Sequence, residues 1–216
     1  MKEFIIFDMD GVIVDSEYTF LSSKTQMLLD RGIDTDESYQ YQFMGTTFEF
    51  MWQKMKSECQ LDDSVETLIN EMNDRREEMI SRDGVKAIQH TPEFIKYLHE
   101  KGYPLAVASS SPRQDIERNL KALKLDHVFD VLVSGEEVEH SKPSPDVFVK
   151  AAQLLGAPVE ACIVFEDTKN GSLAAKAAGM TCVGFANPGY PKQDLSACDK
   201  LISSFKEAYE MFWSVW

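Results

Sequence analysis

The sequence has few cysteines and histidines, and none of them stands in a metal-binding pattern. Its four cysteines are widely spaced without a CxxC pair, and its four histidines show no HExxH or similar ligand spacing. This disfavours both a zinc site and a disulfide framework. We expect reduced thiols that lie mostly in the core; they belong to Cys59, Cys162, Cys182 and Cys198.

Long apolar runs are also missing. No segment has about 18 uninterrupted apolar residues, the length that a membrane-spanning helix needs. The apolar stretch near the N-terminus is too short for a signal peptide and is followed at once by acidic residues. We therefore expect no membrane span and no secretory leader, and a cytoplasmic location.

Positive charge is scarce. The chain has 22 Lys and Arg against 36 Asp and Glu, a net charge of −14, and no run of five basic residues. Such a charge repels nucleic acids and anionic membranes unless a local basic patch opposes it. We expect a small-molecule partner rather than nucleic acid or membrane, and a monomer. An anionic metabolite would need a local cation or metal ion to overcome the overall field.

Short apolar runs alternate with helical patterns, and no internal repeat is present in the 216 residues. Three helices are expected to begin with a Ser or Thr cap before proline, at Thr91, Ser111 and Ser144. The alternation predicts βαβ units in a doubly wound, Rossmann-like parallel α/β sheet. The predicted strands are 4–7, 105–108, 131–133, 162–165 and 182–185.

One long segment breaks this alternation. From 16 to 82 only helical patterns occur, so we expect an all-helical insert at 16–82 in a core formed by 1–15 and 83–216. Its apolar stripes are expected to form the insert's own core rather than a cofactor site; they contain Phe48, Met51, Trp52, Met55, Val65, Leu68, Ile69 and Met72.

Polar residues follow the predicted strands. In open α/β sheets, ligands bind outside the carboxyl ends of the strands, so these residues are expected to meet at one edge. Crowded acids repel one another unless they share a divalent cation, and carboxylate oxygens suit Mg²⁺. The sequence therefore predicts a magnesium site. The segments are Asp8-Met9-Asp10-Gly11, Ser109-Ser110-Ser111, Ser141-Lys142-Pro143 and Glu166-Asp167-Thr168.

The same residues suit phosphoryl transfer. Either Asp8 or Asp10 could attack phosphorus to form an aspartyl-phosphate, while the other transfers protons to and from the reacting oxygens. Lys142 and the metal ion would neutralise the phosphate oxygens, and Ser109 with backbone N–H groups would hold them. Each feature alone is common in turns and helix starts, but four of them at four connections favour this chemistry.

These four segments, in order and spacing, resemble the motifs of the haloacid dehalogenase superfamily. The chain is most similar to the β-phosphoglucomutase-like subgroup of phosphatases and phosphomutases, which carries a helical cap after the first motif. The resemblance implies the strand order 5-4-1-2-3 and a cap that closes over the substrate. It also argues against dehalogenation, because the dehalogenase branch lacks the second aspartate, which is present here as Asp10.

The resemblance also assigns roles to the residues. It makes Asp8 the nucleophile and Asp10 the general acid and base. The phosphate-binding set is Ser109, Ser110 and Lys142. The implied Mg²⁺ ligands are Asp8, the backbone carbonyl of Asp10, Glu166 and Asp167.

The basic residues of the helical insert distinguish a phosphatase from a phosphomutase. β-Phosphoglucomutases place basic residues at three cap positions, which here fall on or near Phe20, Phe48 and Met72; the nearest cations are Arg75 and Arg76. We therefore predict a Mg²⁺-dependent phosphatase of a small phosphorylated metabolite, with a sugar phosphate as the expected substrate and a β-phosphoglucomutase-type phosphomutase as the alternative.

Two other classes fit less well. A phospho-acceptor receiver module needs only about half this length and has no helical insert. A non-catalytic binding protein on an enzyme fold would not need intact Asp8 and Asp10.

Overall fold

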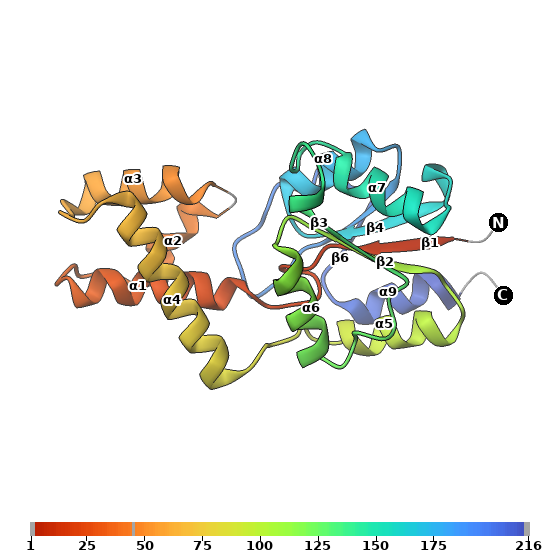
Figure 1. Cartoon of the computed structure of the whole chain (residues 1–216), viewed down its shortest axis with the longest axis horizontal. Coiled ribbons are helices and arrows are strands. Elements are labelled where there is room, and N and C mark those ends of the chain that lie inside the picture. Colours follow the sequence, from red (N-terminus) through yellow and green to blue (C-terminus); the bar gives the residue numbers. More distant parts are fainter. Residues whose placement is uncertain (1–2, 45, 214–216) are drawn as a thin grey trace. The chain divides into compact units, whose positions relative to one another are not determined.

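The computed structural model describes residues 3–44 and 46–213. It divides into two compact units: Met1–Asp15 with Val85–Trp216, and Ser16–Gly84. Figure 1 shows a sheet with helices in the larger unit and helices alone in the smaller one. None of the helices within the described residues has the length and apolar character needed to cross a membrane.

The larger unit is built on a parallel sheet, which has six strands among the described residues, in the order β3-β2-β1-β4-β5-β6. The predicted order of the first five strands is confirmed. The sixth strand was missed because it is only three residues long and two of them are exposed. The strands are β1 Phe4–Phe7, β2 Leu105–Ser109, β3 Val131–Ser134, β4 Cys162–Glu166, β5 Thr181–Phe185 and β6 Lys200–Ile202.

The strand register brings the predicted motifs to one edge. Phe7 at the end of β1 pairs with Val107 on β2 and with Phe165 on β4. The residues that follow these positions therefore leave the sheet at nearly the same level, which places the Asp8, Ser109 and Glu166 segments side by side.

Helices cover both faces of this sheet (Figure 1). Helices α5, α6 and α9 cover one face, and α7 and α8 cover the other. The helices are α5 Thr91–Glu100, α6 Arg113–Ala122, α7 Asp146–Leu155, α8 Lys169–Ala177 and α9 Phe205–Trp213, with short 3₁₀ turns η2 Gly135–Glu137 and η3 Val159–Ala161.

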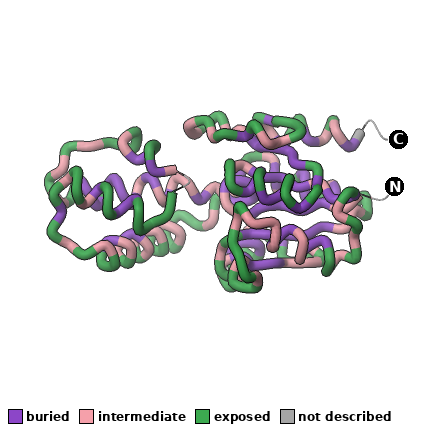
Figure 2. The backbone as a smooth tube through the Cα atoms, turned by 90° about the horizontal axis from the view of Figure 1, so that it is seen from above, coloured by how far each residue is buried: buried purple, intermediate pink, exposed green. Residues whose placement is uncertain are grey.

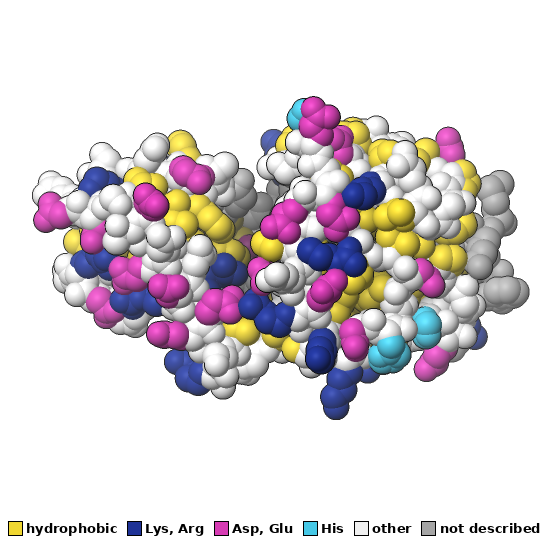
Figure 3. Space-filling model, in the orientation of Figure 1, with side chains coloured by type: hydrophobic (Ala, Val, Ile, Leu, Met, Phe, Trp, Pro, Cys, Tyr) yellow, Lys and Arg dark blue, Asp and Glu magenta, His cyan; other side chains and the backbone are white. Residues whose placement is uncertain are grey.

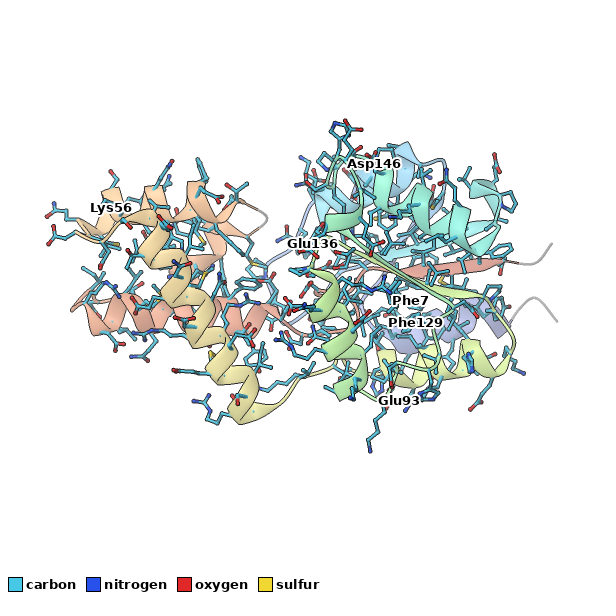
Figure 4. The ribbon with its side chains drawn as sticks, viewed as in Figure 1. Phe7, Lys56, Glu93, Phe129, Glu136 and Asp146 are labelled. Carbon is cyan, nitrogen blue, oxygen red and sulfur yellow. The ribbon has the colours of Figure 1, made fainter. Side chains whose placement is uncertain are left out.

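Aromatic side chains fill the core below β1. The Phe7 ring stacks on Phe165 at a centroid distance of 5.0 Å and meets Phe129 edge-on at 6.1 Å; Figure 4 shows Phe7 and Phe129 pointing toward one another. In the larger unit, Figure 2 shows buried residues concentrated in the central sheet, between helices with more exposed residues. The end of β1, where the site begins, is therefore held on a rigid base.

The three predicted serine and threonine caps are wrong. Helix α5 begins at Thr91 itself, while prolines occupy the cap positions of α6 and α7 without a side-chain cap bond. The Ser111 hydroxyl donates to Asp10 Oδ2, and the Ser144 hydroxyl donates to Asp146 Oδ1. The Ser111 and Ser144 hydroxyls thus bind carboxylates instead of the backbone N–H groups of the helices.

The smaller unit is all-helical, with its own apolar core around Trp52, which is fully buried. The predicted stripes supply most of this core, but Phe48 is 37% exposed and its ring lies against Phe20, 5.5 Å between centroids. The elements are α1 Glu17–Asp30, α2 Glu37–Gln40, η1 Tyr41–Phe43, α3 Phe48–Cys59 and α4 Val65–Asp83.

Ion pairs tie α1 to α4 in this unit. Arg31 pairs with Asp63 and Glu71, and Arg75 pairs with Glu71 and with Asp30 at 2.7 Å. In Figure 3, acidic and basic side chains are interspersed on the visible face of the smaller unit. Arg75, one of the two cations considered for substrate binding, is therefore part of this network.

A buried lysine lies within the smaller unit. Lys24 on α1 is only 4% exposed, and its Nζ donates to Met51 Sδ at 3.4 Å, a weak acceptor. Burial lowers the pKa of Lys24 to about 8, while Glu17 opposes this shift and Arg76 adds to it. The pKa of Lys24 is lower in the folded state than in the unfolded state, so the buried charge lowers the free energy of unfolding below pH 8. This penalty is lost as the pH rises from 8 toward 10.5, the ordinary pKa of lysine.

We expect Lys24→Met to stabilise the protein at pH 7 by about 2 kcal/mol, because it removes the buried charge. Urea unfolding at pH 7 and near pH 10 checks this, and the gain should shrink at the higher pH. Lys54→Met is the matched control, since the Lys54 side chain on α3 is 46% exposed and should show no such pH-dependent gain. An equal gain for Lys24→Met at both pH values would contradict the explanation.

Candidate active site

The first loop of the site is fixed by the end of β1. The backbone N–H of Asp8 donates to the Phe165 carbonyl at 3.0 Å, and Asp8 is only 6% exposed. Gly11 then adopts a φ of +78° and its N–H donates to the Val14 carbonyl. A Cβ at Gly11 would collide with the Asp167 carboxylate, so glycine is required there for both conformation and space.

Lys142 links two of the predicted acids. Its Nζ lies 2.5 Å from Asp8 Oδ1 and 2.7 Å from Glu166 Oε1, and 4.6 Å from the centre of the Phe148 ring. Burial alone lowers the pKa of Lys142, but the two carboxylates raise it overall. Lys142 is therefore a fixed positive charge between Asp8 and Glu166.

Burial is the main influence on the ionisation of Asp8. Burial raises the pKa of Asp8 to about 7; Lys142 opposes this shift, whereas Glu166 and Asp10 add to it. A further cation beside Asp8 would favour its ionised form.

Glu166 is held by the start of α8. Its Oε2 accepts hydrogen bonds from the N–H groups of Asp167 and Thr168, at 2.8 and 2.9 Å, and from the Thr168 hydroxyl. Thr168 also caps α8 by accepting from the Gly171 N–H. A Cβ on Gly171 would collide with the Glu166 carboxylate, so this glycine opens the space that the carboxylate occupies.

Three carboxylates come together at this edge. One oxygen each from Asp8, Glu166 and Asp167 lies within 4.8 Å of the others. Oxygen donors of this kind suit Mg²⁺ or another hard divalent cation. The Asp10 carboxylate is instead bound by Ser111, whose Oγ donates to Oδ2 at 2.5 Å.

The serines at the end of β2 have different surroundings. Ser109 is buried, and its Oγ accepts from the Ser111 N–H at 3.0 Å, whereas Ser110 is exposed. Ser111 belongs to the predicted site segment but was given no role of its own, although it contacts Asp10 directly. The run of three serines was the available signal, but only the fold shows which hydroxyl faces an acid.

The family comparison agrees with this geometry. A model of the family described as haloacid dehalogenase-like hydrolase matches residues 5–185 of the chain. The chain belongs to this family. The match includes Asp8, Lys142, Glu166 and Asp167, so the site lies inside the matched region.

Relatives and solved structures point to the same group. Fructose-1-phosphate phosphatase YqaB of Escherichia coli is 33% identical over 83% of this chain and 94% of its own. A hydrolase of this family from Deinococcus radiodurans, solved with bound phosphate and sodium, superposes with a TM-score of 0.86 at 28% identity, covering 99% of this chain and 96% of its own. A candidate β-phosphoglucomutase from Thermotoga maritima gives 0.84 at 26% identity, covering 99% and 100%.

These findings confirm several predictions. The resemblance to the β-phosphoglucomutase-like subgroup is confirmed, as are the α/β fold with its helical insert and the assignment as a phosphoric monoester hydrolase of the haloacid dehalogenase type. Hydrolases of this family generally use Mg²⁺, and the chain has an acidic cluster suited to it. The roles of the individual site residues stay predictions.

Gly171→Ala tests the close packing around Glu166. The new Cβ must displace a carboxylate that Lys142 and the α8 start hold in place, so we expect the Mg²⁺ concentration for half-maximal activity to rise by about 10–100-fold. Asn170→Ala, at the exposed neighbouring position of α8, is the matched control and should leave this concentration unchanged. Equal Mg²⁺ requirements for the two variants would show that Glu166 accommodates the methyl group.

Proposed function

We propose that the chain is a Mg²⁺-dependent phosphatase that hydrolyses a sugar phosphate through an aspartyl-phosphate on Asp8. The observation that carries the proposal is the position of Asp8: it shares Lys142 with Glu166 and lies in the three-carboxylate cluster. A carboxylate beside a fixed cation and a metal site is suited to attack a phosphate group whose negative charge would otherwise repel it.

The reaction needs two steps at Asp8. In the first, an Asp8 oxygen bonds to phosphorus while the bond from phosphorus to the sugar oxygen breaks, and Asp10 protonates that oxygen. In the second, Asp10 takes a proton from water as the water attacks phosphorus, which releases inorganic phosphate and restores Asp8. Ser111 would orient Asp10 for both transfers through its 2.5 Å hydrogen bond.

The remaining residues would bind the phosphate and the metal ion. Lys142 and Ser109 would hold the phosphate oxygens, with exposed Ser110 at the rim of the site. Asp8, Glu166, Asp167 and the Asp10 carbonyl would hold Mg²⁺, which when bound neutralises charge on the transferred phosphate.

The smaller unit supports a phosphatase over a phosphomutase. A mutase must bind the second phosphate of a sugar bisphosphate, and an unpaired buried charge costs several kcal/mol. Met72 is fully buried in the apolar core, and Phe20 and Phe48 pack against one another. The Arg76 guanidinium lies 3.3 Å from the centre of the Phe20 ring, and its Nε donates to Thr19 Oγ1. Arg76 is thus engaged with Phe20 and Thr19, beside one of the positions at which the resemblance to β-phosphoglucomutases would place a basic residue.

A sugar phosphate is the preferred substrate class because of the relatives. The 33% identical protein of Escherichia coli is a fructose-1-phosphate phosphatase. Hexose and pentose phosphates are therefore the first compounds to test.

The deciding experiment measures phosphate release and isomer conversion side by side. With Mg²⁺ present, we expect release of inorganic phosphate from at least one sugar phosphate to exceed conversion of β-glucose 1-phosphate to glucose 6-phosphate, even when a sugar bisphosphate is added as primer. If primed conversion is faster, the enzyme is a mutase and Arg76 is the first residue to test as the binder of the second phosphate.

A further inference from the structure

Two cysteines that are distant in the sequence meet beside the sheet. Cys182 lies on β5 and Cys198 in the segment before β6, and their Sγ atoms are 3.5 Å apart in a hydrogen bond. Both are free thiols. Neither belongs to the acidic cluster, so the phosphatase reaction gives them no role.

The backbone holds this pair in place. Asp199, next to Cys198, donates its N–H to the Cys182 carbonyl at 2.9 Å, and its Oδ2 accepts from the Cys182 N–H at 2.8 Å. Lys176 fixes the same carboxylate at 2.7 Å. A Cβ at Gly184 would lie 2.7 Å from Cys198 Sγ, so this glycine leaves the space that the sulfur occupies. The two thiols therefore stay close without a covalent bond.

The two thiols are not equivalent. Cys182 is fully buried, whereas Cys198 is only partly buried. The hydrogen bond with Cys182 lowers the pKa of Cys198, burial and the nearby Glu166 charge oppose this shift, and a smaller contribution from Ser172 adds to it. The pKa of Cys182 is raised by the same hydrogen bond and by burial. Because Cys198 is the less buried of the two, we assign it as the attacking thiol and Cys182 as the resolving thiol.

We propose that Cys182 and Cys198 form an oxidisable dithiol that peroxide converts to an intramolecular disulfide. The Cys198 thiolate attacks one oxygen of hydrogen peroxide, the O–O bond breaks, and sulfenic acid forms with release of hydroxide, which takes up the proton lost by the thiol to become water. The Cys182 sulfur then attacks the Cys198 sulfur, the S–OH bond breaks, and a second water leaves with the Cys182 proton. Two thiols are oxidised, and one peroxide is reduced to two waters.

The other cysteines have different neighbours. Cys59 lies in the smaller unit, 3.7 Å from the Tyr39 hydroxyl, and Cys162 is buried with its thiol donating to the Pro158 carbonyl. Within the part of the chain that the structure describes, Cys182 and Cys198 are the pair of cysteines in mutual contact. They are therefore expected to react together and before the others.

The test treats the reduced full-length protein with hydrogen peroxide and maps its peptides without reduction. Trypsin cleaves after Lys176, Lys192 and Lys200, so Cys182 and Cys198 fall on separate peptides, 177–192 and 193–200. We expect loss of two titratable thiols per chain, a cross-linked pair of these peptides, and recovery of both thiols on reduction. A Cys198 peptide carrying sulfinic acid without the cross-link, or a cross-link involving Cys59 or a second chain, would overturn the proposal.

Variants separate the two roles. In Cys182→Ala, Cys198 should stop at sulfenic acid and be trapped by dimedone, whereas Cys198→Ser should leave Cys182 unmodified under the same treatment. Cys59→Ser is the matched control and should give the same yield of the 182–198 disulfide as the natural sequence. If Cys182→Ala unfolds, the peptide map of the natural sequence alone still decides, because it requires no substitution. Unchanged thiol content after peroxide treatment would also refute the proposal.

Discussion

Replacing Asp8 with asparagine is expected to reduce phosphate release by at least about 10⁴-fold, because the amide has no attacking negative charge. The fold should survive. Asp8 is a buried carboxyl whose pKa is already raised, and Lys142 keeps its contact with Glu166. Steady-state kinetics on a sugar phosphate and thermal unfolding of the same sample check both halves of this expectation. A folded Asp8→Asn sample that retains more than a few per cent of activity would reject Asp8 as the nucleophile.

Asp10→Asn is the matched control for this experiment, because it changes the neighbouring acid and keeps the nucleophile. We expect a loss of about 10²–10⁴-fold on a sugar phosphate, whose leaving oxygen needs a proton. The loss should be smaller on an aryl phosphate such as p-nitrophenyl phosphate, whose leaving group departs without one. Equal losses on both substrates would contradict a proton-transfer role for Asp10.

The parts of the fold that follow from hydrophobic pattern could be predicted from the sequence. Buried parallel strands are short apolar runs, and they alternate with helices that carry one apolar face, so their order along the chain was readable. Strand β6 was not readable because its three residues include one buried side chain, Ile202. Phe48 shows that the apolar pattern can also predict too much burial. It follows the apolar period of α3, yet it packs on Phe20 at the surface of the smaller unit.

The sequence indicates which acids come together, but not the contacts that their side chains make. The ends of β1 and β4 identify Asp8 and Glu166, because the edge of a parallel sheet brings the ends of its strands together, whereas Lys142 lies in the long loop between β3 and α7. Nothing in the local sequence shows that the Ser111 hydroxyl turns to Asp10 instead of capping α6. Glycine is needed at position 171 because the Glu166 carboxylate packs against it, and this contact exists only in the folded protein.

Removal of divalent cations is expected to abolish activity, by at least about 10³-fold, and added Mg²⁺ should restore it. The reason is the crowding of Asp8, Glu166 and Asp167, which an incoming phosphate dianion would increase. The measurement is phosphate release after chelation and again after Mg²⁺ addition. Full activity in excess chelator would refute the metal-dependent reaction as a whole.

A binding measurement separates the metal site from catalysis. Saturating Mg²⁺ should stabilise the natural sequence by about 2.7 kcal/mol at 100 times its Kd, since binding to the folded state adds to stability. Asp167→Asn should lose most of this gain, whereas Asp146→Asn, at a carboxylate engaged with Ser144 outside the cluster, should keep it. A Mg²⁺-induced shift in melting temperature that is the same in both variants would exclude Asp167 as a ligand.

The same site should discriminate between metal ions and respond to pH. Ca²⁺ should restore activity poorly, because its larger and looser coordination lets Asp8 bind through both oxygens and leaves none to attack phosphorus. Because the pKa of Asp8 is raised to about 7 without the metal ion, protons compete with Mg²⁺ as the pH falls below 7. The Mg²⁺ concentration for half-maximal activity should therefore rise steadily from pH 8 to about pH 5, where Asp8 without the metal ion is largely protonated. If the Mg²⁺ concentration for half-maximal activity stays constant across this range, the metal ion does not bind next to Asp8. The positive charge that the nucleophile needs would then be missing from its side.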